Sequence, residues 1–433
     1  MFFFEKKNQK TFIHGVRRRR LRDSAPKVFC FFFSKKKFFL SSFTLIRFLK
    51  TAIWCLLALP LARSARLGAV SQTDVYVWQR HWSPALALAV GADAGLFQNW
   101  HVLAAEISPD NLAFRTQANW AYLSAGGHVV VPVIRIDGRI DATRSLALIA
   151  VIRREVAALP EGMRGRLEID HDSATARLAD YAGFLRLLRQ TLPVEKLSVT
   201  ALPTWLHAAS FSAVADAADL LILQVHAIDD PRLGVFDKIR AATWVTLMAR
   251  RTTRPFLVSL PAYGARVVVG SGGRVVAVSG EMPALDGPGG REVAASPQDV
   301  ADFIDGVQRD PPEALRGFVW FRLPTGDDRR AWSDATLRAV VRREVLHPRV
   351  KIVTRPGRLP GLTLLFVTND GDIDANLPQS VQLPAGCERA DGVGAYRRDG
   401  AVLLRDASGG IGPHSATIAG WMRCTKDDET HAP

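Results

Sequence analysis

The sequence runs Val129-Val130-Val131-Pro132-Val133-Ile134-Arg135-Ile136, then a helical pattern over 142–158, then Arg166-Leu167-Glu168-Ile169-Asp170-His171. The first segment is almost continuously β-branched, as strands buried on both faces of a parallel sheet are. The second alternates apolar and polar residues and is followed by another helical pattern over 175–191. The order strand, helix, strand predicts one repeating unit of an α/β fold.

The same alternation continues outward in both directions, over residues 74–347. Eight strands are predicted, at 74–81, 101–107, 129–136, 166–171, 196–202, 220–226, 255–260 and 317–323. Eight strands that alternate with helices predict a (β/α)8 TIM barrel. A doubly wound open sheet is the alternative, but no glycine-rich phosphate loop follows the first strand. Asp172 and Ser173 stand where the helix at 175–191 would need an N-cap, and Ser333 stands before the last helix.

After residue 348 the helical periodicity stops and short strand patterns alternate with turn residues. We predict a small β-sandwich-like domain over 350–424, so the fold class is α/β with a small C-terminal all-β domain. A β-branched run on each side of Gly270–Gly273 predicts a hairpin inside the barrel. Cys387 and Cys424 could pair in an oxidising compartment or remain free.

The positive charge of the chain is concentrated at its N-terminus. Residues 1–66 hold 16 of the 56 basic residues and 2 of the 42 acidic ones, so 40 of each remain in residues 67–433. The neutral remainder has no bulk electrostatic reason to bind a polyanion, so we predict no nucleic-acid partner. The same N-terminal region is rich in Phe and Lys, unlike the rest of the chain.

We interpret residues 1–42 as a non-native or disordered basic extension; a genuine basic tail that touches the membrane is the alternative. Residues 43–66 predict a signal peptide, because Arg47 and Lys50 precede an apolar run and then small residues. The run is about half of the ~20 residues that a spanning helix needs. We therefore predict a periplasmic or secreted monomer, with an uncleaved inner-membrane anchor as the alternative.

Acidic side chains gather at the end of the fourth predicted strand, and a TIM barrel carries its site at the C-terminal strand ends. Glu168, Asp170 and Asp172 alternate and so share one face. Clustered carboxylates raise one another's pKa, which keeps one protonated as a general acid while another stays ionised. We predict Asp170, Asp172 and Glu106 as catalytic residues. The structural alternative is that Asp172 caps a helix and Glu168 pairs with an Arg.

Other predicted strand ends carry aromatic and polar residues, which suit sugar rings and their hydroxyl groups. Packing at the barrel rim is the simpler interpretation for each residue alone, but together they indicate a carbohydrate ligand. The predicted substrate-binding residues are Trp78, Arg80, Arg135, Trp205, Gln224, His226, Tyr263, Trp320 and Arg322. No metal-ligand spacing and no cofactor motif is present in the sequence, so we predict neither a metal nor a cofactor.

Three segments resemble the chitinase-like glycoside hydrolases of family eighteen. Leu257–Gly264 is similar to their seventh strand, and Gly317–Trp320 to their eighth, whose Trp forms the floor of the sugar site. Leu167–Asp172 resembles their fourth-strand motif, D-x-D-x-E. On that register Asp170 and Asp172 match the two Asp positions, and Ala174 stands where the family has its proton-donating Glu.

A closer resemblance is to a bacterial family known as a domain of unknown function (number 3142), on residues 75–80, 167–172 and 197–206. It would cover about residues 74–420, and it implies an exported protein without implying an activity. Two functions therefore remain open. The first is hydrolysis or modification of an envelope or extracellular glycan, as in a glycoside hydrolase. The second is a non-catalytic carbohydrate-binding or envelope structural protein on a hydrolase-like scaffold, which agrees with Ala174.

Overall fold

The computed structural model describes residues 70–226, 230–270, 273–280, 290–387, 389–405 and 409–424. The predicted N-terminal extension (1–42) and signal peptide (43–66) lie outside the described residues. Within the described part of the chain, no helix has both the length and the hydropathy that crossing a bilayer requires.

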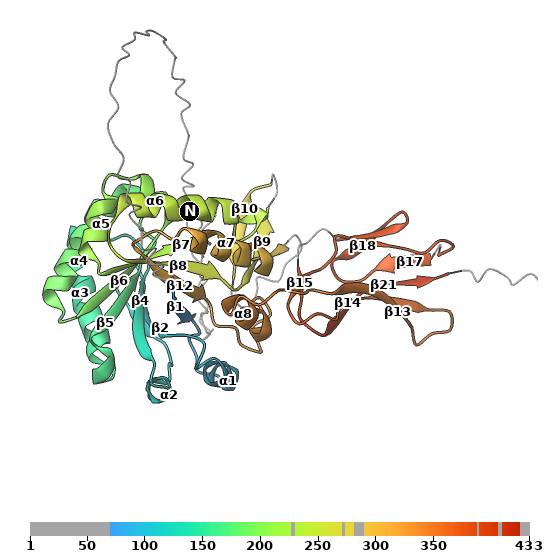
Figure 1. Cartoon of the computed structure of the whole chain (residues 1–433), viewed down its shortest axis with the longest axis horizontal. Helices are drawn as coiled ribbons and strands as arrows, with labels where there is room; N and C mark the ends of the chain where they lie inside the picture. The colour runs from blue at the N-terminus through green and yellow to red at the C-terminus, as the bar shows by residue number, and fades with distance from the viewer. Residues whose placement is uncertain are drawn as a thin grey trace, which may run out of the picture. The chain divides into compact units, whose positions relative to one another are not determined.

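Eight parallel strands form a closed barrel, because β1 pairs with β12 on one side and with β2 on the other. The TIM barrel prediction is therefore confirmed (Figure 1). Around the barrel the strands are β1 (Gln72–Val77), β2 (Asn99–Ile107), β4 (Val129–Ile136), β5 (Arg166–Asp170), β6 (Lys196–Ala201), β7 (Leu220–Gln224), β8 (Phe256–Pro261) and β12 (Leu315–Phe321). A short strand, β3 (Ala113–Arg115), pairs antiparallel with β2.

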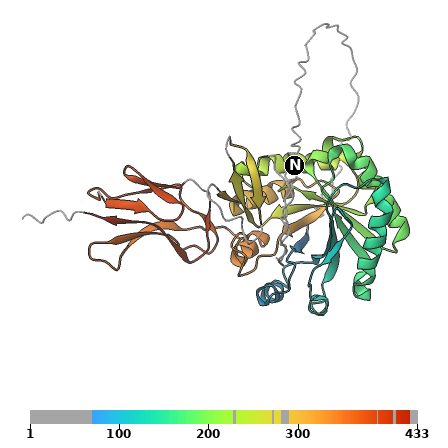
Figure 2. The ribbon, with the colours of Figure 1, turned by 180° about the vertical axis from the view of Figure 1, so that it is seen from behind.

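Helices connect the strands and cover the outside of the barrel, as seen from both sides in Figures 1 and 2. They are α1 (Pro84–Ala92), α2 (Trp120–Ala125), α3 (Ala142–Ala157), α4 (Leu178–Thr191), α5 (Phe211–Ala217), α6 (Lys238–Arg251), α7 (Pro297–Arg309) and α8 (Asp334–Val341). Ser333 caps α8 as predicted, since its hydroxyl accepts from the backbone N–H of Thr336. The prediction that Asp172 or Ser173 caps the next helix is wrong, because a 3-10 turn (Thr175–Arg177) precedes α4.

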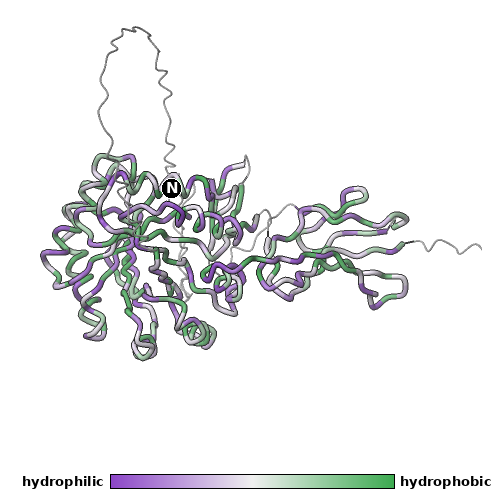
Figure 3. Tube along the Cα trace, viewed as in Figure 1, coloured by the Kyte–Doolittle hydropathy of each residue, from purple (hydrophilic) through white to green (hydrophobic). Residues whose placement is uncertain are grey.

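Two apolar layers lie on opposite sides of the barrel wall, because successive strand residues point to opposite faces. The lumen holds Tyr76, Trp78, Leu103, Val133, Ile222, Leu257 and Val319. The larger layer lies between the wall and the helices and includes Trp100, Tyr181, Trp205, Phe256 and Trp320. Hydrophilic and hydrophobic stretches alternate along the chain in the part that forms the barrel and its helices (Figure 3).

An antiparallel sheet is inserted between β8 and α7. Its strands are β9 (Gly264–Val269), β10 (Val275–Ser279) and β11 (Gly290–Ala294), in the order β10-β9-β11. The pairing of β9 with β10 confirms the predicted hairpin.

The C-terminal region is all β, as predicted, and has its own apolar core that includes Leu365, Val381, Leu403 and Met422. One sheet has the order β13 (Val350–Pro356), β14 (Thr363–Asn369), β21 (Ser415–Arg423) and β17 (Arg389–Gly392). A second has the order β16 (Ser380–Gln382), β19 (Val402–Arg405) and β18 (Tyr396–Asp399), and β15 (Ala375–Asn376) pairs with β20 (Gly410–Ile411). A disulfide joins Cys387 to Cys424.

Candidate functional site

A charged network fills the floor of the barrel lumen. The His101 ring on β2 lies between two carboxylates, with Nδ1 2.5 Å from Oε2 of Glu168 and Nε2 3.2 Å from Oδ2 of Asp74. Tyr76 donates its hydroxyl to Oε1 of Glu168 at 2.5 Å. All four side chains belong to residues that are at most 2% exposed. A network this deeply buried must supply its own compensating charge.

His101 supplies that charge. Burial opposes its protonation, but the charge of Glu168 and hydrogen bonds to Asp74 and Glu168 raise the pKa of His101 to about 10. Burial and the charge of Glu168 also raise the pKa of Tyr76, which therefore stays a neutral donor. Glu168 is thus held by an imidazolium and a phenol instead of the Arg that the structural alternative predicted.

Asp170 lies one step higher in the lumen, where three donors converge on its carboxylate. Arg135 donates from Nη1 to Oδ2 at 2.7 Å, and Thr200 donates to Oδ1 at 2.9 Å. Gln224 donates from Nε2 to the same Oδ1 at 3.2 Å. These donors come from β4, β6 and β7, so the closed barrel assembles the set. They fix the orientation of the carboxyl group.

Asp172 is the outermost acid of the series and the one that reaches solvent. Its side chain is 24% exposed, against 3% for Asp170. Arg135 donates from Nη2 to Oδ2 of Asp172 at 3.3 Å, so one guanidinium serves both carboxyl groups. Burial, and next the charge of Asp170, raise the pKa of Asp172 to about 6 although Arg135 opposes this. A carboxyl group with a raised pKa therefore lies beside a second carboxyl group that three donors hold.

An ion pair forms a second polar part of the mouth. Arg80 donates from Nε to Oε2 of Glu106 at 2.7 Å and from Nη2 to Oε1 at 2.9 Å. Glu106 lies opposite Arg135 in the β2–β4 register, just beyond an irregularity in β2 between Leu103 and Ala105. The bidentate contact fixes the orientation of the Glu106 carboxylate at the mouth.

The other side of the mouth is aromatic. The His226 ring stacks on Phe321 at 5.3 Å, its Nε2 lies 3.2 Å from the Ser259 hydroxyl, and the Tyr263 hydroxyl is 3.4 Å from its Nδ1. Burial lowers the pKa of His226 to about 4 and raises that of Tyr263 to about 12. The rings of Trp78 and Phe321 pack edge to face, with 5.1 Å between their centroids. This side is therefore uncharged at neutral pH.

Two predicted ligand-binding tryptophans lie outside the mouth. Trp205 is fully buried in a 3-10 turn (Pro203–His207), and its Nε1 donates to the carbonyl of Ser173 at 2.9 Å. Trp320 is 1% exposed and packs in the layer between the barrel wall and the helices. Phe321 takes the lumen position at the end of β12 instead, and the sequence-based selection of Trp320 missed it by one residue.

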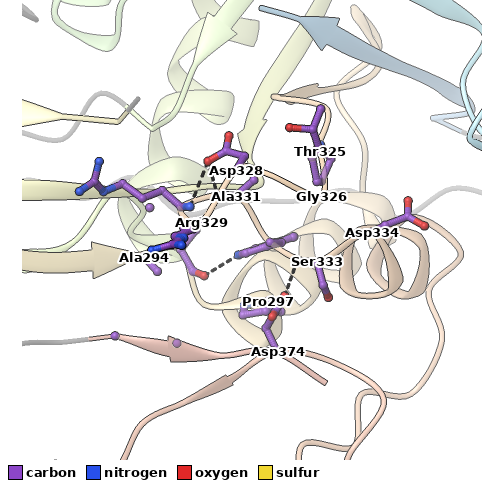
Figure 4. Close-up of a pocket in the computed structure, with 18 of the residues that line it drawn as sticks. Ala294, Pro297, Thr325, Gly326, Asp328, Arg329, Ala331, Ser333, Asp334 and Asp374 are labelled. Atoms are coloured by element: carbon purple, nitrogen blue, oxygen red, sulfur yellow. Dashed lines mark hydrogen bonds between the residues drawn. The ribbon is translucent and has the colours of Figure 1, made fainter. Parts of the chain in front are cut away.

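Arg322 also lies outside the mouth, and its partner Asp328 lines a separate cavity of about 1030 Å³. It pairs with Asp328, whose carboxylate also accepts from the backbone N–H groups of Arg330 and Ala331 (Figure 4). Arg322 therefore braces the loop that follows β12. Neither Asp170 nor Asp172 is among the residues that line this cavity. In the part of the chain that the structure describes, no group of three or more His, Cys, Asp or Glu could hold a metal ion.

Solved structures with the same barrel architecture have low sequence identity to this chain. A chitinase from Chromobacterium violaceum has 16% identity and a TM-score of 0.45, over 63% of this chain and 98% of that chain. A spore cortex-lytic enzyme from Bacillus megaterium has 12% identity and a TM-score of 0.45, over 63% and 73%. A chitinase from Flavobacterium johnsoniae has 11% identity and a TM-score of 0.42, over 63% and 93%.

Family models match both parts of the chain. Residues 352–425 match a domain of unknown function, DUF8456, whose bounds are close to those of the C-terminal β region. No curated protein matches the chain. Residues 126–326 match a second domain of unknown function, DUF3142. This match covers the greater part of the barrel, and the predicted resemblance to that family is therefore confirmed.

Proposed function

We propose that this protein hydrolyses or modifies a glycan at the barrel mouth, with Asp172 as the proton donor. The observation that carries the proposal is the pair Asp170 and Asp172 beside one guanidinium, with the pKa of Asp172 raised to about 6. A carboxyl group with this pKa can hold a proton and release it near neutral pH. Asp170, held by three donors, would stabilise positive charge on a sugar ring.

The depth of the three strand acids supports this assignment. Glu168, Asp170 and Asp172 lie at successive heights, and they are respectively buried, nearly buried and partly exposed. A register shifted by two residues from the one in the sequence comparison would put Glu168, Asp170 and Asp172 at the three acidic positions of the D-x-D-x-E pattern, and we propose this shifted register, with Asp172 in the acid position. Ala174 follows the strand in a loop and is exposed, so its lack of a carboxyl group does not remove an acid from the lumen.

The test measures product release from a panel of soluble oligosaccharides and labelled envelope glycans. Wild-type activity should fall as pH rises through about 6, and Asp172→Asn should lower kcat by a factor of at least 100. Asp180→Asn is the matched control, because Asp180 is an exposed helix residue that pairs with Arg177. Full activity of Asp172→Asn on every cleaved glycan would show that another group is the acid.

A non-catalytic glycan-binding protein is the second candidate function. It is favoured by the ion pairs of the mouth, because both Glu106 and Asp170 are held by an Arg. A carboxylate that pairs with an Arg still has lone pairs that can accept hydrogen bonds from sugar hydroxyl groups. Binding of an oligosaccharide without turnover between pH 4 and pH 8 would decide for this alternative.

Export of the protein is part of the same proposal. The disulfide between Cys387 and Cys424 supports it, because such bonds persist in oxidising compartments. The signal pattern over 43–66 supports it from the sequence. A fusion of residues 1–66 to a reporter enzyme that is active only outside the cytoplasm tests it, and an inactive reporter would contradict it.

A further inference from the structure

The outward face of the sheet β13-β14-β21-β17 has a composition unlike that of a merely solvated surface. Leu365 and Val367 on β14 and Met422 on β21 point into the core of the C-terminal domain, so the residues next to them along each strand point outward. Strand register places Leu364 opposite Trp421, and Phe366 between Val353 and Ile418. These outward apolar side chains belong to residues that are half-buried or exposed, so no other part of the described chain covers them.

Cations surround this apolar centre. The guanidinium of Arg355 lies over the ring of Phe366, with 4.6 Å between its Cζ and the ring centroid. Arg389 on β17 lies directly opposite Arg423 on β21, and both are exposed. Two like charges directly opposite each other destabilise a sheet. None of the described carboxylates forms an ion pair with either of these two arginines.

Few acids share the face. Asp391 lies opposite Trp421, and its Oδ1 accepts from the backbone N–H of Gly392. Asp370 pairs with Lys351 at 3.0 Å, so these two charges compensate each other and add nothing to the net charge of the face. The unpaired charge on the face is therefore positive. Its complement is an anion that can also cover flat apolar surface.

We propose that this face binds a strand of an anionic polysaccharide, such as a glycan of uronic acid units. Sugar rings would stack their C–H faces on Trp421 and Phe366, and their carboxylates would accept paired hydrogen bonds from Arg389 and Arg423. Charge complementarity and the cost of the opposed arginines carry this assignment. The proposal does not depend on chemistry at the barrel mouth, which lies in another domain.

The test uses the whole chain and polygalacturonate as the probe, with binding measured by affinity electrophoresis and calorimetry. Arg389→Gln with Arg423→Gln should weaken binding at least tenfold, and Trp421→Ala at least fivefold. Raised salt should weaken the wild-type complex, because the paired charges are exposed. Arg153→Gln with Arg186→Gln is the matched control, since it removes two exposed arginines from α3 and α4, and should bind like the wild type.

Three outcomes would overturn the proposal. These are unchanged binding in the double variant, equal loss in the control, or tighter binding of single-stranded DNA than of polygalacturonate. The result can be told apart from that of the barrel mouth. Asp172→Asn should bind polygalacturonate like the wild type, and the Arg389 and Arg423 double variant should keep any turnover of short soluble oligosaccharides.

Discussion

Replacing His101 by Gln should destabilise the barrel, because His101 is the cation between the buried carboxylates of Asp74 and Glu168. Gln can donate a hydrogen bond to one of them but carries no charge. Removing one partner of a buried ion pair typically costs about 3–5 kcal/mol, since the other charge is left uncompensated. We expect a loss of unfolding free energy in this range at pH 7.

The pKa of His101 gives the same order of magnitude and fixes the pH dependence. A rise from 6.5 to about 10 corresponds to on the order of 5 kcal/mol in favour of the folded, protonated form. Because the folded pKa is raised, this stability is fully present below pH 6.5 and is lost as pH rises through 10. The difference in unfolding free energy between the wild type and His101→Gln should therefore decrease between pH 7 and pH 10.

Urea unfolding at several pH values measures the free energies, and NMR of labelled histidine rings measures the protonation states. His101 should remain an imidazolium at pH 8. His171 and His226 are internal controls, because burial lowers the pKa of each to about 4 and both rings should be neutral at pH 6. Adding Glu168→Gln to His101→Gln should recover part of the loss. A His101 ring that titrates near pH 6.5, or a cost below about 1 kcal/mol, would refute the reasoning.

Four further results are expected. Asp170→Asn removes a neighbouring negative charge, so carboxyl NMR should show Asp172 titrating below about 6; an unchanged value would exclude the coupling. Trp320→Ala should cost about 3–5 kcal/mol in urea unfolding and leave glycan binding at the mouth unchanged, whereas lost binding in a folded variant would contradict its placement. Cys387→Ser opens a disulfide between positions separated by 37 residues, and should cost the C-terminal domain about 4 kcal/mol, with no further loss on adding reductant. Burial raises the pKa of Asp93 to about 7, so the folded state binds this proton more tightly than the unfolded state does. The resulting stability is fully present below pH 3.8 and is lost as pH rises from 3.8 to 7. The melting temperature of Asp93→Asn should therefore fall less over that pH range than that of the wild type.

The barrel could be predicted from the sequence because its signal is local. Each strand is a short apolar run and each helix has a regular period, so eight repeats suffice to identify the closed fold. The shared face of Glu168, Asp170 and Asp172 follows from the same strand alternation. By contrast, Tyr76 and His101 come from strands 92 and 67 residues away from Glu168, and no local pattern pairs them with it.

The predicted site differs from the structure at two kinds of position. One is where a shift of one residue changes the side of the barrel wall that a side chain faces, and the other is just beyond the end of a strand. Trp320 and Phe321 are adjacent, and only the register of β12 decides which of them enters the lumen. Arg322 lies just beyond that strand and turns to Asp328. Trp205 lies beyond the end of β6, where the chain folds back into the core. Of the four aromatic residues predicted for the site, Trp78 and Tyr263 lie at the mouth, whereas Trp205 and Trp320 lie in the outer core, so a position near a strand end does not by itself identify a mouth residue.

The balance of charge in the lumen explains why the outermost acid is the one to hold a proton. The described side chains of the lumen include four carboxylates and two cations, namely Asp74, Glu168, Asp170, Asp172, His101 and Arg135. The imidazolium serves the two deepest acids, and the guanidinium is shared by the two outer ones, at 2.7 Å to Asp170 but 3.3 Å to Asp172. A proton therefore binds at Asp172 first, where compensation is weakest. In the proposed function, transfer of that proton from Asp172 to a ligand would leave an additional negative charge in the lumen, which would favour positive charge on a bound sugar ring.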